Sequence, residues 1–87
     1  MSDFRLLIAI EVLDLLRSLR PREQEALLRR FREIAGFPSN YSDYTEPDSV
    51  GRRIDVHVFH GFAIKYWADF ADRQVKILDM HAADRAG

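Results

Sequence analysis

Residues 51–85 have the sequence GRRIDVHVFHGFAIKYWADFADRQVKILDMHAADR, and this stretch decides the fold. Three runs in it alternate apolar and polar side chains with the period of two that is typical of strands: RIDVHVF at 53–59, FAIKYWA at 62–68 and QVKILDM at 74–80. His60 and Gly61 predict a tight turn between the first two runs, and residues 69–73 predict a second turn. The stretch therefore predicts three consecutive antiparallel strands.

The segment before residue 51 predicts two helices and one ambiguous stretch. Residues 4–8 suit a strand, but the apolar spacing that continues beyond them also suits a helix, so periodicity leaves both open. The second helix is clearer because Pro21 suits a first helical position, where its missing N–H is no loss. We expect Gly36 to form a left-handed cap and Pro38 to prevent the helix from continuing.

Residues 37–51, FPSNYSDYTEPDSVG, show no convincing periodicity and predict a loop. A loop of this length is long for a compact domain, so it is either functional or mobile. The apolar faces of the helices and strands predict a shared core. Its expected members are Val12, Leu16, Leu27, Leu28, Phe31, Ile34, Ile54, Val56, Ile64, Tyr66 and Ile77.

The composition limits the classes of function. The 87 residues are enough for one domain, and the net charge of −1 argues against a general polyanion binder. The absence of cysteine excludes disulfides, thiol nucleophiles and cysteine-type zinc sites. His57 and His60 fall on opposite faces of a strand, so we expect no metal site, and no cofactor. Charged residues interrupt the apolar N-terminal stretch, which predicts a cytoplasmic protein without a signal peptide or membrane span.

Three stretches together resemble one protein family. LLRSLRPREQEALLRRFREIAGFP (residues 15–38), FAIKYWAD (62–69) and VKILDMHAADR (75–85) are similar to the helix hairpin, third strand and final strand of the RelE/ParE-type toxins of bacterial type II toxin–antitoxin modules. The resemblance covers nearly the whole chain, residues 1–87, as a single domain. It implies an α+β fold with the order β-α-α-β-β-β, in which a helix hairpin packs on a small, mainly antiparallel four-stranded sheet. It also favours a strand at residues 4–8.

The resemblance implies a candidate site for RNA chemistry. Family members that cut mRNA on the ribosome use basic side chains on the exposed sheet face and a histidine or aromatic residue near the C-terminus. Cleavage by the RNA 2′-OH needs a base, an acid and cations that stabilise the phosphorane. The corresponding catalytic candidates are Lys65, His81 and Arg85, and the candidates for RNA binding are Arg52, Arg53 and Lys76.

The chain departs from the active members at three positions. Ala63, Ala82 and Ala83 stand where arginine is common in the family. Three functions remain open: a ribosome-dependent mRNA endonuclease, a non-enzymatic inhibitor of a protein such as gyrase, and an inactive scaffold that binds a partner or itself. The alanines favour the second and third functions.

The resemblance also implies a protein partner. An antitoxin is expected to cover the outer sheet face, where alternation places apolar side chains among charges. The candidates for this contact are Phe59, Trp67, Leu78 and Met80. A small domain that lacks such a partner can instead form a homodimer.

Overall fold

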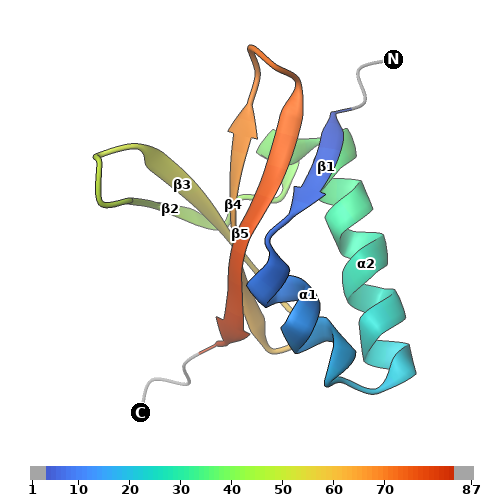
Figure 1. Cartoon of the computed structure of the whole chain (residues 1–87). Coiled ribbons are helices and arrows are strands. Elements are labelled where there is room, and N and C mark those ends of the chain that lie inside the picture. Colours follow the sequence, from blue (N-terminus) through green and yellow to red (C-terminus); the bar gives the residue numbers. More distant parts are fainter. Residues whose placement is uncertain (1–3, 84–87) are drawn as a thin grey trace.

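The structure, a computed structural model, describes residues 4–83. The chain forms two helices, a short 3-10 helix and five strands, in an α+β arrangement (Figure 1). In chain order they are β1 (Arg5–Ile8), α1 (Ile10–Arg17), α2 (Pro21–Gly36), η1 (Pro38–Asn40), β2 (Tyr44–Pro47), β3 (Arg53–Phe59), β4 (Phe62–Asp69) and β5 (Gln74–Ala82). The strands make one sheet in the order β1-β5-β4-β3-β2, in which β1 is parallel to β5 and the other neighbours are antiparallel.

The expected element order is confirmed in its main parts, but the sheet is larger than predicted. The ambiguous residues 4–8 hold a strand, the helix hairpin follows it, and β3, β4 and β5 form the antiparallel meander. The sheet has five strands rather than four, and it is mixed because β1 is parallel to β5, although the other three strand pairs are antiparallel as expected. The α+β class is therefore correct, and the strand count and order were wrong.

The additional strand, β2, lies in the segment that was expected to be a loop. It pairs with β3, where Tyr44 is opposite Val56 and Glu46 is opposite Ile54. The Asp48 carboxylate closes the hairpin by accepting the backbone N–H groups of Val50 and Arg52. A four-residue edge strand has too few positions to show a period of two, so its pairing with β3 decides its structure. In Figure 1 this hairpin extends away from the two helices.

Both helices pack on one face of the sheet. Pro21 occupies the start of α2 as expected, and α2 runs to Gly36. Gly36 is not the left-handed cap that the sequence suggested, since the glycines with positive φ in residues 4–83 are Gly51 and Gly61. The N–H of Phe37 still donates to the Glu33 carbonyl, and α2 ends there because Pro38 follows. No helix of the described part is long and apolar enough to cross a membrane.

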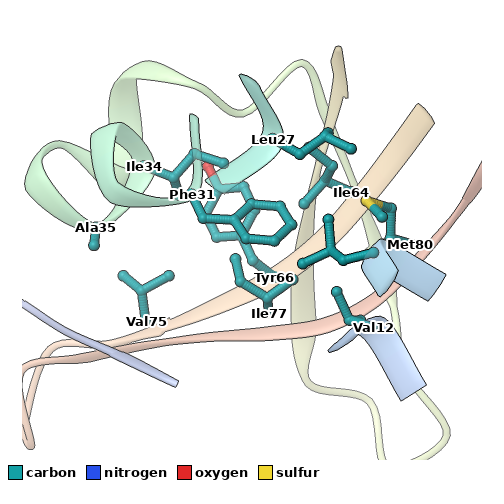
Figure 2. Close-up of a cluster of buried hydrophobic side chains, with 11 residues drawn as sticks. Val12, Leu27, Phe31, Ile34, Ala35, Ile64, Tyr66, Val75, Ile77 and Met80 are labelled. Carbon is teal, nitrogen blue, oxygen red and sulfur yellow. The ribbon is translucent and has the colours of Figure 1, made fainter. Parts of the chain in front are cut away.

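The core lies between the helices and the sheet. Figure 2 shows these buried side chains converging from α1, α2, β4 and β5. Most predicted core residues are buried, and Leu28 is half-buried at the margin. Ile54 and Val56 are buried on the other face of the sheet, because Val56 pairs with Lys65 rather than with Ile64. They lie outside the cluster beneath the helices.

A bulge in β5 changes which side chains face the helices. Lys65 pairs with Asp79, but the next residue, Tyr66, pairs with Ile77, so Leu78 is the extra residue. One extra residue reverses the alternation for everything after it. Met80 therefore faces the core and is buried, whereas unbroken alternation had placed it on the outer face.

Candidate functional site

The sheet face opposite the helices is called the helix-free face here, and it gathers most of the predicted site. On it, Trp67 is opposite Lys76, Lys65 is opposite Asp79, and Ala63 is opposite His81. The Arg52 guanidinium lies over the Trp67 ring at 4.3 Å, and the Lys76 ammonium lies 4.9 Å from the same ring. Lys65, His81, Lys76, Trp67 and Arg52 thus share one surface.

Two cations and one histidine of the helix-free face are each paired with a carboxylate. Lys65 Nζ lies 2.7 Å from Glu46 Oε2, and Arg52 Nε donates to Asp48 Oδ2 at 2.9 Å. His81 Nδ1 lies 3.3 Å from Asp79 Oδ2. The hydrogen bond to Glu46 holds the pKa of Lys65 above its ordinary value of 10.5. The pKa of Asp48 is lowered: its partial burial acts in the opposite direction, but hydrogen bonds from Arg52 and Val50 outweigh it. These pairs lower the positive charge that the face offers to a phosphate.

We expect Glu46→Gln to lower the pKa of Lys65, because Glu46 supplies the largest interaction that raises it. A raised pKa in the folded state means that the pair stabilises the fold below pH 10.5 and that this stabilisation is lost as the pH rises through the folded pKa. The stabilisation from this ion pair is at most about 1 kcal/mol, because both side chains are partly exposed to solvent. NMR titration of the lysine side chains measures the shift. Glu33→Gln, which removes the partner of Arg30, is the control. An unchanged Lys65 pKa in Glu46→Gln would contradict the pairing.

The remaining predicted site residues do not join this surface. Arg53 points to the opposite side of β3 from Arg52, since neighbouring residues of a strand alternate. Phe59 lies on the helix side, where its ring is 4.0 Å from the Arg30 guanidinium. Leu78 is half-buried at the bulge and lines a shallow apolar hollow beside β1. The placement of Phe59 and Met80 on the outer face was therefore wrong, and Arg85 lies outside the described residues.

A second polar cluster, which sequence reasoning missed, lies on the helix side of the sheet. His57 is only 7% exposed and is held on both ring nitrogens. Its Nδ1 lies 3.0 Å from Asp43 Oδ2, and its Nε2 lies 2.8 Å from Arg30 Nη1. Arg30 also donates to Glu33 at 2.8 Å, and its guanidinium lies 4.9 Å from the centre of the Tyr41 ring.

The hydrogen bonds of this cluster indicate which ring nitrogen of His57 carries the proton. Arginine can only donate, so Nε2 accepts from Arg30 and Nδ1 carries the proton that it donates to Asp43. A hydrogen bond from the Val58 N–H is the main cause that keeps the pKa of Asp43 below 3.8, and the bond from His57 adds to it. The cluster joins α2, the segment before β2, and β3. Asp43 lies 14 positions before His57 in the sequence, and Arg30 lies 27 positions before it, so no local sequence motif indicates the cluster.

The chemistry available at these two places is limited. His57 has both nitrogens occupied, so in this arrangement it can position α2 and β3 but cannot exchange a proton with a ligand. His81 is exposed and retains Nε2 for a substrate. Residues 4–83 hold no group of three or more His, Asp or Glu side chains that could bind a metal ion.

Comparisons with protein-family models, with curated proteins and with solved structures find no match to the chain. Support for a function therefore comes from the arrangement of its own side chains.

Proposed function

We propose that this chain is a divergent toxin component of a bacterial type II toxin–antitoxin module, which works in the cytoplasm and is held by an antitoxin. The order of the elements supports the proposal, because a strand, a helix hairpin and an antiparallel meander are what the resemblance implies. The strand β2, which the resemblance does not imply, lies between the helix hairpin and the meander.

The toxin is expected to act by binding a protein, such as gyrase, rather than by cutting RNA. The observation that carries this choice is the pairing of Lys65, Arg52 and His81 with carboxylates, beside alanine at position 63. RNA cleavage develops negative charge on the phosphate and needs cations that are free to stabilise it. A face on which Lys65 and Arg52 already hold carboxylates favours protein contacts, in which charges of both signs are useful.

A ribosome-dependent endonuclease is the second candidate, and one observation favours it. Trp67 lies between Arg52 and Lys76, and an aromatic ring with flanking cations can stack a base and contact a phosphate. In that function His81 is the proton donor or acceptor, and Lys65 and Arg85 stabilise the phosphate. Removing a general acid or base typically slows such a reaction by about 100-fold or more.

An antitoxin is proposed to cover the helix-free face. Trp67 offers an aromatic contact there, and Leu7 and Leu78 line the adjoining apolar hollow. An amphipathic segment suits this combination of apolar and charged groups. Co-expression with the product of the neighbouring gene is expected to yield a stable complex, and a homodimer is the alternative if the chain is isolated alone.

Induced expression in a bacterial host tests the proposal. We expect growth to stop, the messages to stay intact, and the arrest to persist in His81→Ala. Growth arrest with cut messages that disappears in His81→Ala would establish the nuclease instead. Normal growth at a protein level confirmed by immunoblot would contradict a toxin and leave the scaffold function.

A further inference from the structure

A hollow lies at the end of the sheet, where β3 begins and β4 ends, and Trp67 is the one lining residue that the proposed function uses. Its volume is about 370 Å³, within the range of small-ligand sites. η1 forms its rim and is anchored there, because the Tyr66 hydroxyl donates to the Pro38 carbonyl at 2.5 Å. The lining residues are Ser39, Arg53, Asp55, Trp67, Ala68 and Phe70.

The side chains of the hollow offer complementary chemistry. The Arg53 guanidinium makes no ion pair with any residue from 4 to 83, and the Ser39 hydroxyl has no hydrogen-bond partner within the same range, so both can bind an oxyanion. The Asp55 carboxylate can accept an N–H group. Phe70 is 61% exposed, and its ring, which meets the Phe4 ring nearly at a right angle, can stack with a flat group.

We infer that this hollow binds a nucleoside phosphate whose base carries an amino group. Arg53 and Ser39 hold the phosphate, Phe70 and the edge of Trp67 contact the base, and Asp55 accepts from the amino group. A simple phosphate would leave the Phe70 ring and the Asp55 carboxylate without a partner. The ligand that satisfies all of these groups therefore joins an anion to an aromatic amine.

The inference is independent of the proposed toxin function. Arg53 and Asp55 face away from the helix-free face, so Trp67 is the one lining residue that the hollow shares with the surface proposed for the antitoxin. The same chemistry can come from a free nucleotide or from one nucleotide of a single-stranded RNA. If the ligand is a free nucleotide, a mononucleotide is expected to bind; if it is part of an RNA strand, binding is expected to need an oligonucleotide.

Trp67 is the chain's one tryptophan, and it lines the hollow, so its fluorescence reports binding directly. AMP is titrated into the full chain up to millimolar concentration, with ribose 5-phosphate and adenosine as partial ligands and a short oligoadenylate as the strand. We expect a saturable change with AMP, and binding at least about tenfold weaker with either partial ligand, since each loses a charged hydrogen bond or a stacked ring.

Substitutions inside the hollow and one substitution outside it make a matched set of variants. Arg53→Ala is expected to weaken AMP binding by about tenfold or more, and Phe70→Ala by about fivefold or more. Arg22→Ala removes an exposed arginine from the first turn of α2 that does not line the hollow, and it is expected to leave the affinity within about twofold. Arg53 and Phe70 are exposed, so unchanged far-UV circular dichroism is expected for all three variants.

Binding of oligoadenylate but not of AMP, with the same dependence on Arg53, would support the site and identify a strand as its source. No saturable change with either ligand would overturn the inference. Binding that is equally strong in Arg53→Ala, or that ribose 5-phosphate reproduces fully, would also overturn it.

Discussion

Phe31→Ala is expected to lower the free energy of unfolding by about 3–5 kcal/mol. The Phe31 side chain is 0% exposed and lies in the cluster between α2 and the sheet (Figure 2). Removing the ring loses its burial and leaves a cavity that the surrounding strands cannot fill. A domain of this size is expected to have a total stability of roughly 5–10 kcal/mol, so the variant is expected to be partly unfolded at 37 °C. Urea denaturation followed by circular dichroism measures the change.

Phe37→Ala is the matched control, because Phe37 follows the same helix but is 65% exposed. Its effect is expected to stay within about 0.5 kcal/mol. If Phe31→Ala were as stable as Phe37→Ala, the packing of α2 on the sheet described above would be wrong.

His57→Leu is expected to cost about 2–3 kcal/mol of stability. Leucine fills a similar space, so the loss comes mainly from the hydrogen bonds. Arg30, which is partly buried, would lose an acceptor, and such a loss costs about 1–3 kcal/mol. The loss of the hydrogen bond to Asp43 is expected to cost less stability, because half of the Asp43 side chain is exposed and water can replace His57. The contact of the imidazole with Tyr41 is lost as well.

Two variants make the His57 experiment specific. His57→Gln is expected to recover part of the loss, because its amide can accept from Arg30 and donate to Asp43. His81→Ala is expected to change stability by less than about 0.5 kcal/mol, since His81 is exposed at the end of β5. Equal stability of His57→Leu and the unaltered chain would show that the cluster does not hold α2 against β3.

Asp43 adds a pH dependence to the same cluster. Its pKa in the folded protein lies below 3.8, so the interaction stabilises the fold above that pH and is lost as the pH falls through the folded pKa. Asp43→Asn is therefore expected to lose less stability than the unaltered chain between about pH 5 and about pH 2, as urea midpoints at each pH would measure. A parallel decline of both proteins would assign acid sensitivity to other carboxylates.

The alternation of apolar and polar side chains, together with the residues typical of turns and helix starts, was sufficient to predict the strands from 53 to 80 and the helix that begins at Pro21. His60 and Gly61 form the expected turn, with positive φ at both residues. β2 was missed because four residues do not establish a period, and its partner strand is what makes it a strand. The prediction placed the wrong face of β3 against the helices, because this orientation also depends on the pairing with another strand. Ile54 and Val56 are apolar, but their register with β4 directs them to the helix-free face.

The sequence predicted several residues of the candidate site correctly, but it did not predict how their side chains pair. Lys65, Lys76, Trp67 and His81 share a face, and His81 reaches it because of the bulge at Leu78, which alternation does not reveal. The partners of the cations could not be predicted, because Glu46 and Asp48 belong to the hairpin that was expected to be a loop. The cluster around His57 depends on contacts between three separate elements, so only the folded arrangement brings it together.

The proposed function predicts that the chain does not cut RNA. The most direct test adds the purified chain to ribosomes that are translating a defined message and maps the 5′ ends of the message by primer extension. We expect no cleavage within translated codons above the level seen without the chain, because Lys65, Arg52 and His81 on the helix-free face are paired with carboxylates. Codon-dependent cleavage that falls by about 100-fold or more in His81→Ala would contradict the claim and make the domain an enzyme.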